Sequence, residues 1–443
     1  MSARLLYLLR WFLELHRPPA YGSNIEIAAE VERNYRWNFA VNLLDVTTFW
    51  FGFSFISATT VVPFYISQLS DSSLPIGIAA VIAQASWFLP QLLTANIVER
   101  LPRKRPVVVR VGFLLERLPI WLLVVSALVA VRSPGLALVL FLVGYGWRGL
   151  GAGFVATSWQ DLIARAFPME RRGRFLGISL FSGTLAGTVA AFISGRLLEG
   201  FPFSTNFLYN FLLAAIFMTM SWLFISRTRE PASAGRAPRR SNRQFMAELP
   251  AILRADDNFR QFMIARSLIA FGALGTGFIT VSAVNRWGIP NSTIGTYTAA
   301  QLIGQAIATP GFGLLADRFG HKLTLELGAT CATLAFLLAW LAPSPDWYFL
   351  VFALLGATNG AIIVSGILII MEFGPAEKRP TYTGMANTVV GLVSVAAPLV
   401  GAWLASVGYD LLFSVGAVVT LAGLTWLHFL VREPRHKARI MEN

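Results

Sequence analysis

The sequence contains very little cysteine and little charge. Its 443 residues include a single cysteine, Cys331, and only 13% of them are charged. One cysteine excludes an internal disulfide. A soluble protein of this length would carry about twice this charged fraction. The shortage of charge therefore argues against an ordinary soluble domain.

Histidine is also scarce, and a glycine-rich phosphate-binding loop is missing from the sequence. The four histidines are scattered near the expected membrane interfaces: His16, His321, His428 and His436. This spacing predicts no metal site and no converging set of catalytic groups. Without a phosphate loop, ATP hydrolysis is not the expected energy source. We therefore expect no enzyme activity, no cofactor and no metal.

Apolar residues dominate the chain instead. They make up 55% of it, and the mean hydropathy is +0.61. An apolar stretch of about 20 residues is long enough to cross a bilayer as a helix. Twelve such spans are expected, at residues 38–65, 75–98, 106–131, 136–164, 172–196, 203–226, 259–284, 292–316, 322–342, 347–371, 382–405 and 409–430. The sequence therefore predicts an all-α membrane protein with twelve transmembrane helices.

The net charge of +13 is distributed in a way that indicates topology. With both termini on one side, about 30 of the 36 Lys and Arg residues fall on that side. Only about three, Arg132, Arg196 and Arg286, fall on the other. Cytoplasmic loops of membrane proteins carry such an excess. We therefore expect a plasma or inner membrane protein with both termini in the cytoplasm, and no nucleic-acid binding.

The chain is expected to divide into two six-span halves. The expected parts are an N-terminal segment (1–36), a first half (37–226), a basic linker (227–257), a second half (258–431) and a cytoplasmic tail (432–443). In the N-terminal segment, the apolar residues of "LLYLLRWFLELHR" fall near one helical face. This pattern favours a helix in the membrane interface, and a short leader without fixed structure is the alternative. A short surface helix is also expected at 242–254.

Two pairs of polar turns indicate that the halves are an internal duplication. "ANIVERLPRK" (95–104) follows span two, and "GLLADRFGHK" (313–322) follows span eight, 218 positions later. "PMERRGRFLG" (168–177) and "PAEKRPTYTG" (375–384) form the second pair, 207 positions apart. Many transporters are built from such repeats, with the ligand path between them.

The turn after span eight resembles the loop signature G-x-L-A-D-R-x-G-R-K of the major facilitator superfamily. The matching residues are Gly313, Leu315, Ala316, Asp317, Arg318, Gly320 and Lys322, whereas His321 stands where an arginine is usual. The chain is similar to this family over residues 37–432. The resemblance implies two pseudo-symmetric six-helix bundles of the major facilitator type, working as a monomer.

Both turns are expected to act as gates. Asp317 would sit at a helix C-terminus, where a carboxylate opposes the helix dipole at a cost of about 0.3–1 kcal/mol. The resemblance implies that Asp317 faces the start of span five, around 171–174, and that Glu99 faces the start of span eleven, around 378–379. Both contacts would exist only while the cytoplasmic side is closed. Charge that only sets topology is the alternative. In the first copy Pro102 replaces the second glycine, so that turn needs a different backbone path.

Other residues extend these turns. Gly320 suits a position with positive φ just past a helix end, and Gly313 would permit close helix approach. The resemblance also implies that Asp161, near the inner end of span four, binds Arg103. An interfacial charge near Arg165 is the alternative. The full set of gating-turn residues is Glu99, Arg100, Arg103, Lys104, Asp161, Gly313, Asp317, Arg318, Gly320 and Lys322.

Charged residues inside the spans are a sharper signal, because each costs at least about 2.5–3.5 kcal/mol at mid-span on insertion scales. They are Asp45 in span one, Glu116 and Arg117 in span three, Arg148 in span four and Arg266 in span seven. Asp45 and Glu116 are the proton-coupling candidates. In the family, spans one, four, seven and ten line the central cavity, which implies that Asp45 alternates between protonation and a pair with Arg266. A static ion pair is the alternative for Asp45, and a structural role is the alternative for Glu116.

Four residues are candidates for the substrate cavity: Arg148, Arg266, Trp50 and Asn359. Arg148, in "GYGWRGLGAGF", can bind an anionic group or tune a neighbouring acid, and a hydrogen-bonded structural role is the alternative. Trp50, in "FWFGFSF", can contact an apolar or cationic ligand. Asn359 lies in span ten, which lines the cavity in the family. Packing and interhelical hydrogen bonding are the alternatives for these two residues.

These features predict a secondary active transporter that moves a small molecule by alternating access. Proton-coupled export is the first expectation. Proton-coupled uptake of a small solute, or a non-transporting sensor or scaffold, is the alternative. The expected partners are the small-molecule substrate, protons and the lipid bilayer.

Overall fold

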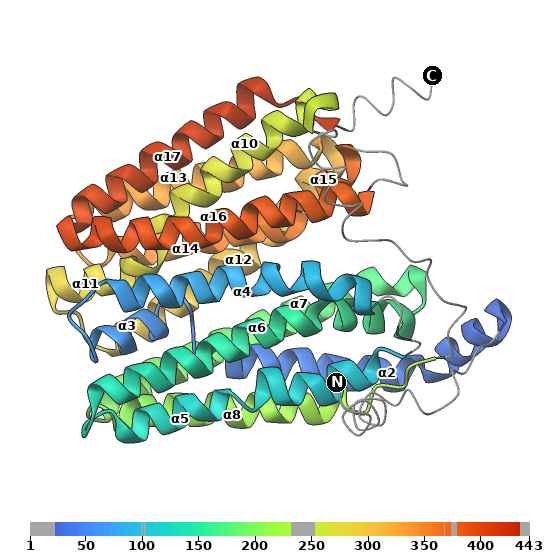
Figure 1. Ribbon diagram of the computed structural model, residues 1–443, viewed down its shortest axis with the longest axis horizontal. Helices are drawn as coiled ribbons and strands as arrows, with labels where there is room; N and C mark the ends of the chain where they lie inside the picture. Colours follow the sequence, from blue (N-terminus) through green and yellow to red (C-terminus); the bar gives the residue numbers. More distant parts are fainter. Residues whose placement is uncertain are drawn as a thin grey trace, which may run out of the picture. The chain divides into compact units, whose positions relative to one another are not determined.

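A computed structural model of the protein contains helices joined by turns and loops, with no strand among its described residues, which are 23–98, 101, 103–231, 253–366, 368–373 and 379–434 (Figure 1). Ten helical segments among these residues are long and apolar enough to cross a membrane. The prediction of an all-α membrane protein is thereby confirmed. Of the twelve predicted spans, the first two are not among these ten, and the second contains a shorter apolar helix at Leu74–Trp87.

The helices follow one another through the two predicted halves. Those before the linker are α2 (Asn24–Ser54), α3 (Val61–Ser67), α4 (Leu74–Val98), η1 (Val107–Val111), η2 (Phe113–Arg117), α5 (Ile120–Val129), α6 (Pro134–Ala166), α7 (Met169–Gly200) and α8 (Thr205–Ile225). Those after it are α10 (Asp257–Gly272), η3 (Ala273–Phe278), α11 (Ile279–Trp287), α12 (Ser292–Phe319), α13 (His321–Leu341), α14 (Trp347–Ser365), α15 (Leu368–Phe373), α16 (Arg379–Val407) and α17 (Tyr409–Leu430).

The first span differs from its prediction at both ends. Ser23 caps α2 by accepting from the Glu26 amide, while Glu26 accepts from the Ser23 amide, so the helix begins at Asn24 rather than at residue 38. Residues 24–36 therefore continue into the span as one helix. At the other end α2 stops at Ser54, and a turn at 55–60 separates it from α3. The helix expected near residues 5–15 lies outside the described residues, as does most of the one expected at 242–254.

The contacts of the chain fall into two compact units. Unit 1 comprises residues 1–56, 89–190 and 207–240, and unit 2 comprises residues 57–88, 191–206 and 241–443. Each unit is described separately below. The predicted division at the linker stays a prediction.

In unit 1, the α5 and η2 segments pack closely on α6. Small buried residues recur on α6 at every seventh position, namely Ala137, Gly144, Gly151 and Ser158. A Cβ added at Gly144 would lie 2.8 Å from Leu122 Cβ, and one added at Gly151 would overlap the Leu115 carbonyl. Small residues at this spacing allow helix backbones to approach closely in a membrane.

Two π-helical turns, η1 and η2, precede α5 in the third span. Leu118 N donates to the Phe113 carbonyl over 2.8 Å, five residues back. Pro119 has no amide proton and cannot bond to the Leu115 carbonyl four residues earlier. That carbonyl lies against Gly151 of α6. Such bulges appear frequently at functional sites, and η2 contains Glu116 and Arg117, two of the charged residues of the span.

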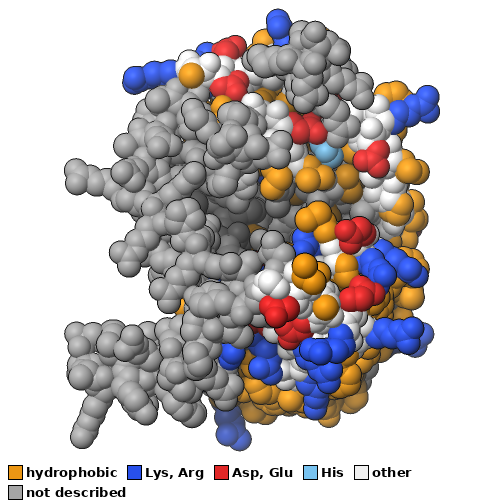
Figure 2. Space-filling model, turned by 90° about the vertical axis from the view of Figure 1, so that its right-hand side faces the viewer, with side chains coloured by type: hydrophobic (Ala, Val, Ile, Leu, Met, Phe, Trp, Pro, Cys, Tyr) orange, Lys and Arg blue, Asp and Glu red, His pale blue; other side chains and the backbone are white. Residues whose placement is uncertain are grey.

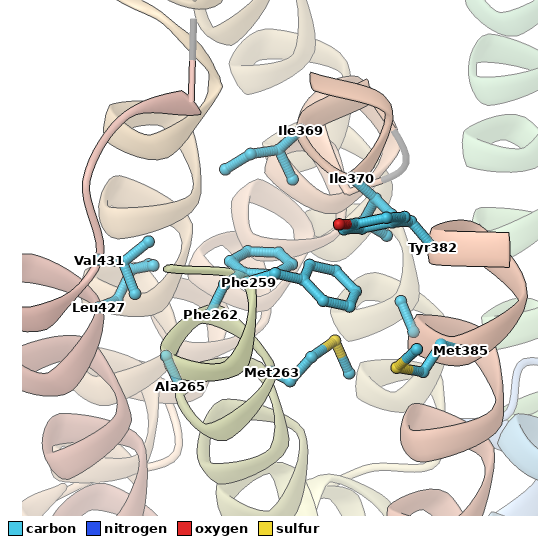
Figure 3. Close-up of a cluster of buried hydrophobic side chains, with 11 residues drawn as sticks. Phe259, Phe262, Met263, Ala265, Ile369, Ile370, Tyr382, Met385, Leu427 and Val431 are labelled. Atoms are coloured by element: carbon cyan, nitrogen blue, oxygen red, sulfur yellow. The ribbon is translucent and has the colours of Figure 1, made fainter. Parts of the chain in front are cut away.

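In unit 2, aromatic and aliphatic side chains form a core at one end of α10. Figure 3 shows Phe259, Phe262 and Met263 of α10 facing Ile370 of α15 and Tyr382 of α16. The Phe259 and Tyr382 ring centroids are 4.5 Å apart, and the Tyr382 hydroxyl donates to Asp256 Oδ2 over 3.2 Å. Asp256 also caps α10 by accepting from the Phe259 amide. The core therefore attaches α15 and α16 to the start of α10.

Unit 2 also joins segments from both predicted halves. Thr60 and Thr298 hydroxyls are 2.5 Å apart, and Thr59 donates to Gln301 Oε1 over 2.6 Å. Ser73 Oγ donates to the Ala402 carbonyl over 2.7 Å. A Cβ added at Gly195 of α7 would lie 2.6 Å from the Ser292 carbonyl of α12. Residues 57–88 and 191–206 are thus bound to the second half by hydrogen bonds and glycine packing.

One packing relationship occurs in both halves. A Cβ added at Gly52, in the first span, would lie 2.9 Å from Met218 of α8. A Cβ added at Gly272, in the seventh span, would lie 2.8 Å from the Thr420 amide of α17. Each glycine stands just before an irregular segment, residues 55–60 in the first span and η3 in the seventh. The sixth and twelfth spans therefore hold the first and seventh in the same way.

Candidate functional site

Asp45 lies at the centre of a cluster of charged side chains in unit 1. Its residue is only 4% exposed, although it sits in an apolar helix, α2. The Ser221 hydroxyl of α8 donates to Asp45 Oδ1 over 2.6 Å. Arg117 Nη2 donates in turn to Ser221 Oγ over 3.5 Å. Within the described part of the chain, Asp45 has no direct ion pair, so its carboxylate is held by a neutral hydroxyl.

Glu116 and Arg117 form an ion pair with each other. In a regular α-helix, two adjacent side chains point about 100° apart and need not meet. They lie at the end of η2, where the wider π-helical turn reduces the angle between consecutive side chains. Both residues are 8% exposed, and the Arg117 guanidinium also lies 5.1 Å from the Phe49 ring centroid. This arrangement favours the structural role, and proton coupling by Glu116 stays a prediction.

Arg148 projects from α6 against aromatic rings. Its guanidinium carbon lies 4.9 Å from the ring centroid of Phe53 and 5.8 Å from that of Tyr145. The residue is 7% exposed, and its Nε atom is buried without a hydrogen-bond partner among the residues that the structure describes. No carboxylate among the described residues pairs with it. Arg148 is therefore held by rings rather than by an acid.

Three aromatic residues of α2 continue this surface. The Phe49 and Phe53 rings stack with centroids 5.8 Å apart, and Trp50 meets Phe53 edge to face at 5.8 Å. A Cβ added at Gly183 of α7 would lie 2.6 Å from Trp50 Cδ1. Beside it, the Thr47 and Ser182 hydroxyls are 3.0 Å apart. Trp50 therefore packs α2 on α7, and its role in the cavity stays a prediction.

Arg266 and Asn359 lie in unit 2. Arg266 Nη1 donates to the Gly366 carbonyl over 2.7 Å, at the break between α14 and α15. This carbonyl ends the α14 helix and would otherwise lack a helical partner. Asn359 is exposed on α14 and makes no hydrogen bond to the residues described. The Asp45–Arg266 pair across the two halves stays a prediction.

The first gating turn is described only in part, because Glu99 and Arg100 lie outside the described residues. Asp161 of α6 pairs with the fully buried Lys104 at 3.3 Å and with Arg165 at 3.1 Å. The neighbouring Arg165 that we weighed as the alternative is therefore a partner of Asp161. The expected contact with Arg103 stays a prediction.

Glu230, just after α8, completes this inner network. Its carboxylate accepts from the backbone amides of Lys104 and Arg105, over 2.8 and 2.9 Å, and Arg165 Nη1 lies 3.9 Å away. Burial raises the pKa of Glu230 above its ordinary value, against the effect of the two amides and Arg165. Burial also lowers the pKa of Lys104, although Asp161 opposes this. The network attaches the third, fourth and sixth spans to one another.

The second gating turn is fully described. Gly320 has φ of 95°, which confirms the expected positive φ, and Glu433 packs against it. Lys322 Nζ lies 3.3 Å from Glu326 Oε1 and donates to the His428 carbonyl over 2.9 Å. At Gly313, an added Cβ would meet none of the described atoms within 4 Å, so the expected close approach is wrong there. The turn is thus bound to the end of α17.

The remaining gating residues face the surface. Asp317 and Arg318 are both exposed, and the Arg318 guanidinium lies 5.1 Å from the ring centroid of Phe319. In the first half, Arg171 pairs with Glu32 at 2.8 Å. Figure 2 shows Lys, Arg, Asp and Glu side chains gathered on one face, with hydrophobic side chains along its edge. The gating role of Asp317 stays a prediction.

Several residues of the site could not be identified from the sequence. Ser221 is one small polar residue in an apolar span, and nothing in the sequence links it to Asp45, 176 positions away. Phe49 and Phe53 were visible only as part of an aromatic run. Glu230 lies in the segment predicted as the basic linker, residues 227–257. The signal available for Phe49 and Phe53 was their spacing of four residues, which places both on one helical face.

Comparisons with known proteins match parts of the chain. The family model "Major Facilitator Superfamily" matches residues 262–442. The chain is 28% identical over 136 residues to "Multidrug resistance protein 3" of Bacillus subtilis (strain 168), and 31% identical over 189 residues to "Putative metabolite transport protein YyaJ" of the same organism. These alignments cover 30% and 40% of this chain, and 26% and 40% of the relatives. The chain therefore spans well under two thirds of either relative.

A solved structure shares the fold over most of the chain. A crystal structure of the nucleoside transporter NupG matches with a TM-score of 0.66 at 13% identity, over 89% of this chain and 100% of that one. This likeness shows that the chain shares the fold of that transporter. The family match bears out the resemblance found in the sequence over residues 262–442, and the ten long apolar helices indicate a protein that crosses the membrane several times.

Proposed function

We propose that the protein is a secondary active transporter that exports a small molecule in exchange for protons. The observation that carries this proposal is the buried Asp45 carboxylate in α2, which accepts from the neutral Ser221 hydroxyl. A carboxylate without a direct cationic partner can gain or lose a proton without breaking an ion pair. An ionised group at this depth is costly, so an intramembrane acid by default marks an ion pathway.

Alternating access is supported by the composition of unit 2. Segments 57–88 and 191–206 of the first half bind the second half through Thr59, Thr60 and Ser73. By the predicted topology, these segments lie at the non-cytoplasmic ends of their spans. Contacts between the halves at this end would close the outer side, and they would have to break for the outer side to open.

Export is favoured by a relative named for multidrug resistance, whereas the metabolite transport protein leaves uptake as the second candidate. We further propose a monomer in the plasma or inner membrane, with both termini in the cytoplasm and no enzyme activity. Its partners are the transported solute, protons and the surrounding lipid.

The direction is tested with the full chain reconstituted in vesicles that contain a pH-sensitive dye. A panel of small organic solutes is added under an imposed pH gradient, and the luminal pH and solute are followed together. Export by exchange predicts that solute and protons move in opposite directions across the membrane. Movement in the same direction would replace export with uptake, and solute movement unaffected by the gradient would remove proton coupling.

A further inference from the structure

Arg148 is the one member of the buried charge cluster, among the described residues, that lacks a polar partner. Glu116 and Arg117 pair with each other, and Asp45 accepts from Ser221. Arg148 contacts only the rings of Phe53 and Tyr145 through its guanidinium. Its Nε is buried without a hydrogen-bond partner, although the residue is 7% exposed. Buried polar groups in native proteins nearly always have partners.

The ring contacts offset part of the cost of placing this charge at mid-span, but they do not supply hydrogen bonds. A ring face also leaves the five N–H donors of a guanidinium unused. The missing element is an acceptor, and a planar carboxylate fits the two-pronged geometry of arginine best.

The surface beside Arg148 is apolar and aromatic. Phe49, Trp50 and Phe53 lie on consecutive turns of α2 and are all partly exposed, which distinguishes them from the fully buried aromatic core. Their ring faces and edges can contact a flat apolar body, while a charged head group reaches the guanidinium. The site therefore offers one cationic group next to several rings.

We propose that Arg148 binds the anionic head group of the transported solute, and that the solute is an organic acid with an apolar or aromatic body. The proposal rests on the transporter function proposed above and assigns its substrate class. Phe53 holds the guanidinium from one side and contacts the body of the solute from the other. A neutral amide of the same shape would lose the charged contact and bind weakly.

Binding to the purified full-length protein tests this assignment without requiring transport. The probes are benzoate, 1-naphthoate and octanoate, with benzamide and benzylamine as the neutral and cationic counterparts of benzoate. Intrinsic tryptophan fluorescence and the unfolding temperature are measured against probe concentration. We expect saturable binding of at least one of the carboxylates, and no binding of benzamide or benzylamine at the same concentrations.

Substitutions separate a ligand role from a structural one. Arg148→Gln should raise the carboxylate Kd at least about tenfold, because a hydrogen bond to a charged group is worth about 1.5–3 kcal/mol. The carboxylate Kd of Arg148→Lys should lie between those of the wild type and Arg148→Gln, since lysine is a point charge without the planar fork. Phe53→Leu should weaken 1-naphthoate more than octanoate. Arg132→Gln, an exposed arginine between α5 and α6, is the matched control and should bind like the wild type.

Three results would overturn the assignment: no carboxylate binds, benzamide binds as well as benzoate, or Arg148→Gln keeps the wild-type Kd. If Arg148→Gln does not fold, the assignment is overturned when Arg148→Lys keeps the wild-type Kd and Phe53→Leu weakens 1-naphthoate no more than octanoate. Carboxylate binding without proton-driven transport would contradict the proposed function and leave this site in place. Proton-driven transport of solutes that no carboxylate displaces would support the proposed function and contradict the assignment of Arg148.

Discussion

Gly195 of α7 and Gly295 of α12 cross with their backbones in direct contact, since a Cβ added at Gly295 would overlap the Gly195 backbone. One glycine belongs to the first predicted half and the other to the second. Near this crossing, Glu199 Oε2 accepts from the Ser292 amide over 3.1 Å, and Asn291 donates to the Leu198 carbonyl over 3.4 Å. A transporter that opens on this side must separate these backbones.

Thr60, in the turn before α3, and Thr298 of α12 also join the two predicted halves on this side. A disulfide between these two positions should therefore stop transport. In a Cys331→Ser background, Thr60→Cys with Thr298→Cys places thiols where two hydroxyls now lie 2.5 Å apart, close enough for a disulfide of ordinary geometry. We expect oxidation to nearly abolish solute flux in vesicles, and a reductant to restore it.

The matched control is a disulfide that leaves the two halves free. Thr47→Cys with Ser182→Cys joins α2 and α7 within the first half, where the hydroxyls are 3.0 Å apart. This pair should form its disulfide and keep most of the flux. Equal loss of flux in both pairs, or full flux with the 60–298 bond formed, would mean that this contact need not open.

Gly151 should be the most sensitive glycine of the α6 packing face. A Cβ there would overlap the Leu115 carbonyl, which belongs to backbone and cannot move aside cheaply. We expect Gly151→Ala to lower the free energy of unfolding by about 1–3 kcal/mol. Thermal unfolding in detergent measures the change.

Gly177→Ala serves as the control for helix propensity. Gly177 is inside α7, and an added Cβ there meets no described atom within 4 Å. This change should be neutral or stabilising by up to about 1 kcal/mol. If the two variants unfold at the same temperature, the close α6 contact does not contribute to stability.

Glu230 should make stability depend on pH. Because burial raises its pKa above the ordinary 4.5, the folded state holds this proton more tightly than the unfolded state. Stability from this group is present at low pH and is lost as the pH rises from 4.5 through the raised pKa. The unfolding temperature of Glu230→Gln should not decrease in this way as the pH rises. Glu170 is exposed, so Glu170→Gln is the control and should show the same decrease as the wild type. A wild-type pH profile in the Gln variant would remove Glu230 as its source.

The fold class followed from the sequence because apolar length and loop charge are local properties. The first span illustrates the limit: the hydropathy predicted one helix at 38–65, whereas the Ser23 cap and the turn at 55–60 divide the segment differently. The break after Ser54 lies next to Gly52, which is in close contact with Met218 of α8. No residue within the first span indicates this contact with α8.

The same distinction applies to the site. Asp45, Glu116, Arg117 and Arg148 could be found because each is a charge in an apolar run. Their pairing could not be found, since it depends on the π-helical turn before Pro119 and on Ser221 in a distant span. Asp161 pairs with Lys104 and Arg165, and its partner Lys104 could not be identified from the sequence. Sequence spacing identified the charged residues, and tertiary packing selected their partners.

The central claim is that Asp45 carries the proton, and Asp45→Asn tests it most directly. In vesicles with an imposed pH gradient, the wild type should move protons whenever the transported solute is present. Asp45→Asn should bind the solute and exchange it across the membrane, but move no protons. Asp71→Asn, an exposed acid after α3, controls for loss of charge. Solute-dependent proton movement that persists unchanged in Asp45→Asn would contradict the account.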